Sequence, residues 1–263
     1  MSETFLDKVT ARTREHVADM KNDEYTKAYK RKAESIRRSR FPFALLHALA
    51  AKGRTNIIAE IKRASPSRGV IKTNVNAATQ AERYVAGGAA AISVLTEPDH
   101  FQGSVDDLVK VREAVNVPVL RKDFIVDEFQ ILEAAAAGAD AVLLIVAALT
   151  QVELVKFCSF AEELGLDSLV EVHDADELLR AADAGVTIIG VNNRNLHSLE
   201  VSLGVSRELA AQKPENTIFV AESGLNSRTE IDELRGLGFD AFLIGETLMR
   251  SDDPVRTLEE LGA

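Results

Sequence analysis

The chain has 263 residues, of which 46% are hydrophobic and 27% are charged, a balance typical of a folded globular protein rather than a disordered one. The formal net charge of −10 argues against general binding to nucleic acid, so an anionic ligand would need a locally positive site. The single cysteine excludes an internal disulfide and any multi-cysteine metal centre, and it fits a reducing, cytoplasmic compartment.

Residues 1–50 lack the pattern that fills the rest of the chain, and we expect them to form a helical extension. Charges run through residues 1–16 without an apolar core, so this segment is neither a signal peptide nor an anchor. The longest apolar run, residues 141–149, is about half of what a membrane-spanning helix needs, so we expect no membrane contact. The basic stretch at residues 27–40 is expected to be a solvated helix face docked beside the site entrance, rather than a nucleic-acid patch.

From about residue 55 onwards, a short apolar run, a helical pattern and a glycine recur in a fixed order. Most of the runs are apolar almost throughout, which is typical of parallel strands covered on both faces. The predicted strands cover residues 56–63, 90–96, 118–124, 141–147, 168–173, 188–194, 217–223 and 241–246. Helical patterns between them include residues 77–86, 105–115, 128–137, 151–164 and 228–237.

Glycines mark five of the junctions at which a helix gives way to a strand. They are Gly88, Gly138, Gly165, Gly185 and Gly238. Glycine suits the left-handed conformation in which many helices end. Eight strand–helix units at this spacing predict an α/β fold, a (β/α)8 TIM barrel, with residues 1–263 as a single domain and residues 1–50 as its extension. The alternative is an open, doubly wound sheet, but no G-x-G-x-x-G follows the first strand.

Polar side chains lie near the carboxyl ends of six of the eight predicted strands, where the active sites of such barrels are found. In the first strand, Glu60 and Lys62 share one face, and we expect it to point into the barrel because apolar residues occupy the other. The other strands end in Arg121, Lys122 and Asp123; Glu171 and His173; Asn192, Asn193 and Arg194; Glu222; and Glu246. An ion pair or a helix cap at the rim of the barrel would explain a polar residue at one strand end. Six that converge on one mouth predict an acid–base site.

The turns after the seventh and eighth strands indicate a phosphate site. Barrels often bind phosphate there, and Ser223, Gly224 and Gly245 would let backbone N–H groups approach the anion. Ordinary turn chemistry explains the same residues, so both interpretations stay open on this evidence alone. Ser65 and Arg68, which follow the first strand, are candidates to reach the same anion.

Several segments resemble the indole-3-glycerol phosphate synthase family in order and spacing. The first strand and its loop read IAEIKRASPS at residues 58–67, which resembles the family's signature. Further similar segments are SVLTEPDHFQGS (93–104), VLRKDFIVDEFQI (119–131), LLIVAAL (143–149), LVEVHD (169–174), IGVNNRNL (189–196), AESG (221–224) and LIGETLM (243–249). The resemblance spans nearly the whole chain, including the N-terminal extension.

This resemblance implies a cytoplasmic carboxy-lyase of tryptophan biosynthesis that uses neither a metal nor an organic cofactor. The family closes 1-(2-carboxyphenylamino)-1-deoxyribulose 5-phosphate to indole-3-glycerol phosphate, with loss of carbon dioxide and water. The implied partner is therefore a small phosphorylated molecule. The sequence does not decide the oligomeric state, and a monomer is compatible with it.

The resemblance also implies catalytic roles. Lys122 would be the general acid that protonates the substrate carbonyl during ring closure, and Glu171 would be the acid and base of the dehydration. Lys62 would pair with the substrate carboxylate, while Glu60 and Asn192 would hold the reacting groups in place. How the two lysines divide the proton transfers stays open. Repulsion between two nearby lysines would lower the pKa of the donating one.

Binding roles follow from the same segments. Arg194 and Glu222 would contact the substrate, and the candidates for an apolar slot around its ring are Phe101, Phe124, Leu143 and Leu196. The phosphate would be held by Lys62, Ser65, Ser223, Gly224 and Gly245. Many relatives have a small polar residue where this chain has Glu246, whose carboxylate would repel phosphate. Only the backbone N–H of Glu246 is expected to contribute.

Two other functions are kept open. One is a sibling phosphosugar isomerase, although isomerisation would not account for the combination of Glu60, Lys62, Lys122 and Glu171. The other is a non-catalytic barrel that binds a phosphorylated ligand, although every inferred catalytic position holds a chemically competent residue.

Overall fold

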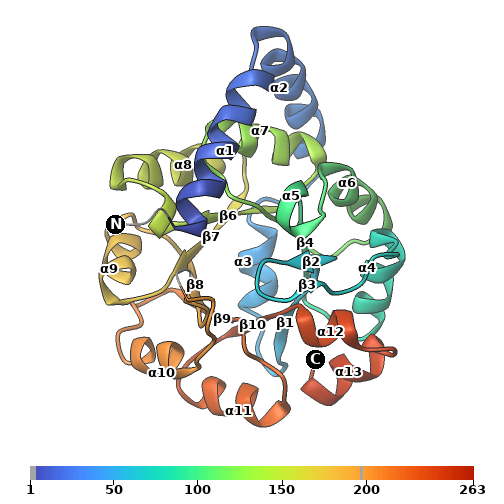
Figure 1. Ribbon diagram of the computed structural model, residues 1–263, viewed down its shortest axis with the longest axis vertical. Helices are drawn as coiled ribbons and strands as arrows, with labels where there is room; N and C mark the ends of the chain where they lie inside the picture. The colour runs from blue at the N-terminus through green and yellow to red at the C-terminus, as the bar shows by residue number, and fades with distance from the viewer. Residues whose placement is uncertain (1–3, 196–197) are drawn as a thin grey trace.

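The computed structural model describes residues 4–195 and 198–263, and its centre is a closed barrel of eight parallel strands (Figure 1). The strands are β1 (Asn56–Ile61), β4 (Ala91–Leu95), β5 (Val119–Lys122), β6 (Ala141–Ile145), β7 (Asp167–Val172), β8 (Ile188–Asn192), β9 (Ile218–Glu222) and β10 (Ala241–Ile244). They follow one another around the barrel in chain order, and β10 closes it by pairing with β1, with Ala241 opposite Asn56. The predicted barrel is therefore confirmed.

Helices surround the barrel and connect successive strands (Figure 1). They are α4 (Ala77–Ala86), α5 (Pro98–Phe101), α6 (Val105–Ala114), α7 (Glu128–Ala137), η1 (Val146–Ala148), α8 (Gln151–Glu163), α9 (Ala175–Asp183), α10 (Gly204–Ala210), α11 (Arg228–Gly236), α12 (Glu246–Arg250) and α13 (Pro254–Leu261). A short hairpin of β2 (Ala64–Ser65) and β3 (Gly69–Val70) follows β1. The five predicted junction glycines all have positive φ angles, between 67° and 103°.

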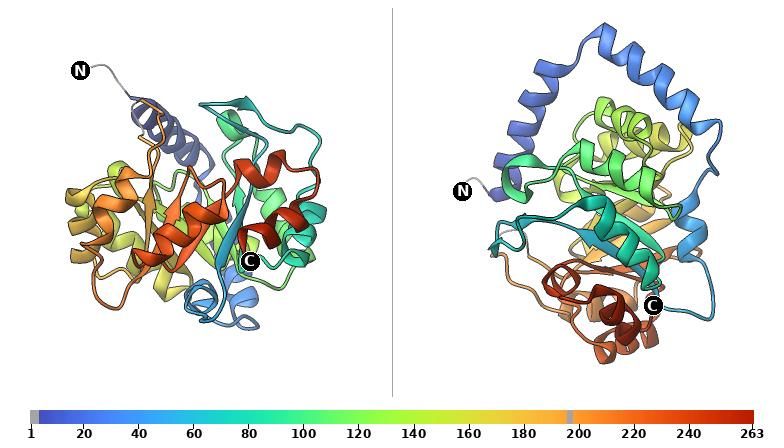
Figure 2. Two further views of the ribbon diagram at one scale, coloured as in Figure 1. Left: turned by 90° about the horizontal axis from the view of Figure 1, so that it is seen from below. Right: turned by 90° about the vertical axis from the view of Figure 1, so that its right-hand side faces the viewer.

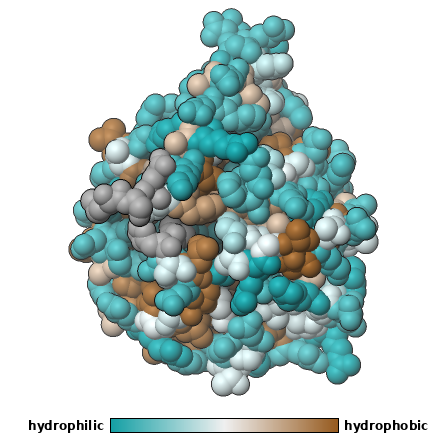
Figure 3. All heavy atoms as spheres, viewed as in Figure 1, coloured by the Kyte–Doolittle hydropathy of each residue, from teal (hydrophilic) through white to brown (hydrophobic). Residues whose placement is uncertain are grey.

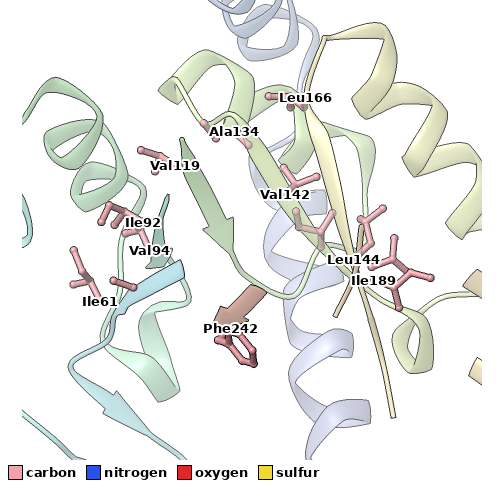
Figure 4. Close-up of a cluster of buried hydrophobic side chains, with 14 of the residues drawn as sticks. Ile61, Ile92, Val94, Val119, Ala134, Val142, Leu144, Leu166, Ile189 and Phe242 are labelled. Carbon is pink, nitrogen blue, oxygen red and sulfur yellow. The ribbon is translucent and has the colours of Figure 1, made fainter. Parts of the chain in front are cut away.

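Successive strand residues point alternately into the barrel and out towards the helices. Ile57, Ala59 and Ile61 belong to the apolar layer between strands and helices, part of which Figure 4 shows. Ile58 belongs instead to a second apolar cluster inside the barrel, together with Leu120, Leu169, Val220 and Leu243. The inward face predicted for Glu60 follows, because this residue lies two positions beyond Ile58 on the same strand.

The N-terminal extension comprises α1 (Phe5–Met20), α2 (Asp23–Arg37) and α3 (Ala44–Leu49). The first two form a helical hairpin that projects beyond the barrel (Figure 2). Tyr29 of α2 packs against Phe129 of α7, with ring centroids 5.5 Å apart. The third helix closes the amino-terminal end of the barrel, where the carboxylate of Asp167 accepts hydrogen bonds from the backbone N–H groups of Leu45 and Leu46. In the described part of the chain, no helix has both the length and the apolar character needed to cross a membrane.

The basic stretch is anchored at the end of the barrel opposite to the one expected. Arg37 and Arg40 join Arg112 of α6 around the fully buried carboxylate of Asp140, at N–O distances of 3.5, 2.7 and 2.8 Å. Asp140 immediately precedes β6, so these arginines lie at the amino-terminal end of the strands. The expectation that the stretch docks beside the site entrance is wrong for Arg37 and Arg40, because a buried carboxylate at the other end requires their positive charges.

We predict that Asp140→Asn lowers the free energy of unfolding by about 3–5 kcal/mol, because it leaves buried arginines without their counter-charge. Denaturant unfolding followed by circular dichroism measures the change. Glu260→Gln is the matched control, since its partner Arg256 is 75% exposed and such pairs contribute less than about 1 kcal/mol. Equal unfolding midpoints for Asp140→Asn and the wild type would contradict the prediction.

Candidate active site

A cavity of about 820 Å³ opens at the carboxyl ends of the strands. Figure 3 views this face of the molecule, on which hydrophobic side chains lie among hydrophilic ones. All fifteen predicted site residues within the described ranges line the cavity: Glu60, Lys62, Ser65, Phe101, Lys122, Phe124, Leu143, Glu171, Asn192, Arg194, Glu222, Ser223, Gly224, Gly245 and Glu246. Leu196 lies outside the described residues.

Four charged side chains form one layer inside the barrel mouth. Glu60, Lys122, Glu171 and Glu222 come from β1, β5, β7 and β9, which are alternate strands of the barrel. Each lies two residues beyond an inward-facing apolar residue of its own strand. Alternate strands of such barrels contribute side chains to the same layer, so the chain places these four groups at one height above an apolar floor.

Lys122 is the centre of this layer. Its Nζ lies 2.9 Å from Glu171 Oε2 and 2.7 Å from Glu222 Oε2. Burial lowers the pKa of Lys122, but the negative charges of Glu171, Glu222 and Glu60 together raise it above its ordinary value. The expectation of a pKa lowered by a neighbouring lysine is therefore wrong for this residue. The reason is that carboxylates, rather than ammonium groups, lie next to it.

The two carboxylates that share Lys122 have different pKa values. The pKa of Glu222 is raised to about 7, mainly by burial. Lys122 lowers this pKa, but the negative charges of Glu171 and Glu60 counteract that effect. Burial acts on Glu171 in the same direction, but Lys122 and His173 lower its pKa well below the ordinary value. Such a separation suits a site in which one carboxylate accepts protons while its neighbour titrates near neutrality.

Two glycines make room for the charged layer. A Cβ at position 190 would overlap Glu222 Oε1, and a Cβ at position 245 would overlap Glu60 Oε1. Glu60 also holds Lys62, with 2.6 Å between Oε1 and Nζ. The sequence analysis did not assign a role to Gly190. A lone glycine inside an apolar strand is the signal that indicates such a close approach.

The predicted phosphate end of the cavity is rich in arginine. Arg194 donates a hydrogen bond from Nη1 to Ser67 Oγ at 3.0 Å. The carboxylate of Glu246 pairs with Arg68 at 3.3 Å and with Arg250 at 3.0 Å. The sequence analysis missed Arg250, which lies one helical turn after Glu246.

Aromatic side chains form the apolar side of the cavity. Phe124 lies between Phe101 and Phe5, with ring centroids 6.2 and 6.1 Å away. Phe5 and Leu6 belong to α1, so the extension contributes to the cavity wall. The sequence analysis missed both, because they lie far from the strand repeat. Among the described residues, no cluster of three or more His, Cys, Asp or Glu side chains is arranged to hold a metal ion.

Known proteins resemble this chain in sequence and in fold. The sequence family described as indole-3-glycerol phosphate synthase matches residues 6–261. The indole-3-glycerol phosphate synthase of Koribacter versatilis is 48% identical over 249 residues, which cover 95% of either chain. That of Aquifex aeolicus is 50% identical over 235 residues, covering 89% of this chain and 91% of the relative.

A solved structure supports the fold alone. The 3-hexulose-6-phosphate synthase of Salmonella typhimurium superposes with a TM-score of 0.64 at 14% identity, covering 79% of this chain and 96% of the other. The sequence match extends over the barrel and almost all of the described extension. The chain belongs to the indole-3-glycerol phosphate synthase family.

Proposed function

We propose that this protein closes 1-(2-carboxyphenylamino)-1-deoxyribulose 5-phosphate to indole-3-glycerol phosphate, with release of carbon dioxide and water. The observation that carries this function is the buried ion triad of Glu171, Lys122 and Glu222, in a chain that matches the synthase family over residues 6–261. The triad provides an ammonium donor beside two carboxylates of different pKa values, which is what successive proton transfers require.

Lys122 is the general acid of ring closure. The aromatic carbon that carries the carboxylate attacks the sugar carbonyl, and the carbonyl oxygen must be protonated as the new bond forms. A raised pKa makes Lys122 a weak acid beside its two carboxylates. Its proton is nevertheless present throughout the neutral range and lies in a position that lines the cavity. The negative charge that develops on the oxygen supplies the driving force for its transfer.

Glu171 serves the dehydration. Loss of carbon dioxide restores the aromatic ring, after which one proton leaves the methylene carbon and the hydroxyl leaves as water. Glu171 is ionised because Lys122 and His173 lower its pKa. It is therefore ready to accept the methylene proton and to return it to the leaving oxygen.

Different groups hold the two ends of the substrate. Lys62 binds the substrate carboxylate, and Glu60 and Asn192 orient the reacting groups. Arg194 binds the substrate between them. The phosphate occupies the end of the cavity formed by Ser65, Ser223, Gly224 and Gly245, together with the backbone N–H of Glu246. Binding energy from this remote phosphate orients the reacting atoms.

The substrate ring occupies the apolar side of the cavity, between Phe101, Phe124 and Leu143. Glu222, which belongs to the same charged layer as Lys122, also contacts the substrate. We further propose that residues 1–263 act as one barrel domain, as a monomer and in the cytoplasm. The residues given a role here line one cavity of a single barrel, which supports the assignment to one domain, and a single free thiol fits a reducing cytoplasm.

The deciding experiment is to incubate the purified chain with 1-(2-carboxyphenylamino)-1-deoxyribulose 5-phosphate and no added metal, and to follow indole fluorescence. We expect the fluorescence to rise at a catalytic rate, with release of carbon dioxide. Binding of the substrate without any product would instead support a non-catalytic barrel. Isomerisation of an aminosugar phosphate in its place would support the sibling isomerase.

We predict that Lys122→Ala lowers kcat at least about 100-fold while KM changes little, because the variant loses a proton donor used in the transition state. Lys62→Ala should change both kcat and KM, because Lys62 also binds the substrate carboxylate. Lys156→Ala is the control, since its side chain is 58% exposed and lies outside the cavity. Near-normal turnover by Lys122→Ala would refute its assignment as the general acid.

We predict that Gly190→Ala and Gly245→Ala each lower kcat/KM by about 100-fold, because the added methyl group displaces Glu222 or Glu60 by an ångström or more. Gly236→Ala is the matched control. It lies in α11, and a Cβ there would meet nothing within 4 Å. Steady-state kinetics at one pH compare the three variants. Wild-type kcat/KM in Gly190→Ala would show that the position of Glu222 is not critical.

A further inference from the structure

Glu171 contacts a second cation besides Lys122. His173 Nε2 lies 3.4 Å from Glu171 Oε1, on the opposite side of the carboxylate from Lys122. The Nδ1 atom of His173 lies 3.0 Å from Glu177 Oε2 in the first turn of α9. The same Glu177 oxygen accepts a hydrogen bond from the backbone N–H of His173 at 2.8 Å. Glu177 thereby orients the imidazole ring so that Nε2 lies on the side of Glu171.

These contacts extend the triad into a row of five groups with alternating charge. The row runs from Glu222 through Lys122, Glu171 and His173 to Glu177. The first three line the cavity, whereas His173 and Glu177 lie outside its lining. Side-chain exposure rises along the outer part of the row, from 3% at Glu171 to 13% at His173 and 15% at Glu177. The row therefore leads from the reacting centre towards the outer surface at α9.

His173 Nε2 is buried and has no hydrogen-bond partner among the described residues. Its 3.4 Å contact with Glu171 Oε1 is slightly too long and too poorly aligned for a hydrogen bond. A small movement of either side chain would complete this bond. An unsatisfied buried nitrogen destabilises the fold, so its position beside a carboxylate calls for an explanation.

The reaction in the proposed function needs one proton from solution in each turnover. The substrate carboxylate leaves as neutral carbon dioxide, and the electron pair of its C–C bond returns to the ring. The carbonyl oxygen gains two protons before it leaves as water, whereas the substrate itself loses only one, from its methylene carbon. Lys122 and Glu171 together therefore end each cycle one proton short.

We propose that His173 delivers this missing proton to Glu171, which passes it on to Lys122. The inference rests on the proposed function. The N–H bond at His173 Nε2 breaks as an O–H bond forms at Glu171 Oε1, and rotation of the carboxyl group then presents the proton to Lys122 Nζ. The neutral ring keeps its proton on Nδ1, which faces Glu177, so the solvent proton has to return to Nε2. Rotation of the ring about its Cβ–Cγ bond exposes Nε2 on the side of α9, where it is protonated again. His173 is a relay residue that acts through Glu171 and does not touch the substrate.

The electrostatics agree with the direction of transfer. Burial lowers the pKa of His173, but Glu171 and Glu177 raise it to about 10, so the ring is cationic at neutral pH. Those two carboxylates are the charged groups acting on the ring from β7 and α9, and η1, which packs against both elements, is apolar. Once Lys122 has given up its proton, Glu171 loses its strongest stabilising charge, and burial then favours its protonation by His173.

The test compares His173→Gln with the wild type in steady-state turnover. We expect kcat to fall at least about tenfold while KM stays within about twofold, because the relay acts after the substrate has bound. Glu177→Gln should give a smaller fall in kcat, since it leaves the imidazole in place but loosely oriented. His47→Gln is the control, because His47 is exposed on α3 at the opposite end of the barrel.

A second variant separates proton delivery from packing. In His173→Ala, added imidazole should restore kcat with saturation, while the same concentrations leave Lys122→Ala unchanged. Unchanged kcat in His173→Gln, or a loss in His173→Ala that imidazole does not repair, would overturn the relay. Wild-type turnover is measured first. An active wild type with a fully active His173→Gln would refute the relay alone, whereas an inactive wild type would refute the proposed function.

Discussion

A lysine ammonium held between two buried carboxylates is the interaction on which the site depends. Taking a single charge out of water costs several kcal/mol, and removing one member of a buried pair leaves that cost uncompensated. Lys122, Glu171 and Glu222 are all at least 88% buried at their side chains, so each is stable there only with the others. They come from three strands that meet only when the barrel closes. Barrel closure and assembly of the charged layer are therefore coupled.

The apolar floor beneath this layer strengthens the attraction between its charged groups. Ile58, Leu120, Leu169 and Val220 lie one inward position below the four charged residues on the same strands. This floor excludes water from one side of the ammonium and strengthens its attraction to the carboxylates. It also explains why Glu222 titrates near neutrality although a lysine lies 2.7 Å away.

The sequence predicts the strands and their faces because both depend on local patterns. Apolar runs and junction glycines locate all eight strands, and the alternation in the first strand places Glu60 inside. The predicted strands nevertheless extend too far, for example to residue 63 where β1 ends at Ile61. Arg63 lies beyond the end of the strand, and its guanidinium pairs with Asp107 of α6 at 2.6 Å. Local patterns do not contain contacts of that kind.

Pairings between distant residues account for what the sequence could not predict. Lys122 and Glu222 are 100 residues apart, and no local pattern links them. The position of α2 depends on Asp140, a carboxylate that the sequence presents only as part of a helix-to-strand turn. The lone Gly190 signals a close approach in the sequence, but that Glu222 fills the space is seen only when β8 lies beside β9.

The ion pairs at the two ends of the cavity differ in solvent exposure and therefore in strength. Lys62 and Glu60 are 17% and 4% exposed, so their pair is poorly screened and keeps the reacting end in one geometry. Arg68 is 59% exposed and Arg250 52%, and exposed pairs such as theirs with Glu246 contribute less than about 1 kcal/mol. Under the proposed function, a substrate phosphate bound beside them would compete with Glu246 for these arginines at little cost. The loosely paired end is then suited to capturing the substrate, while the firmly paired end keeps the catalytic groups in place for the reaction.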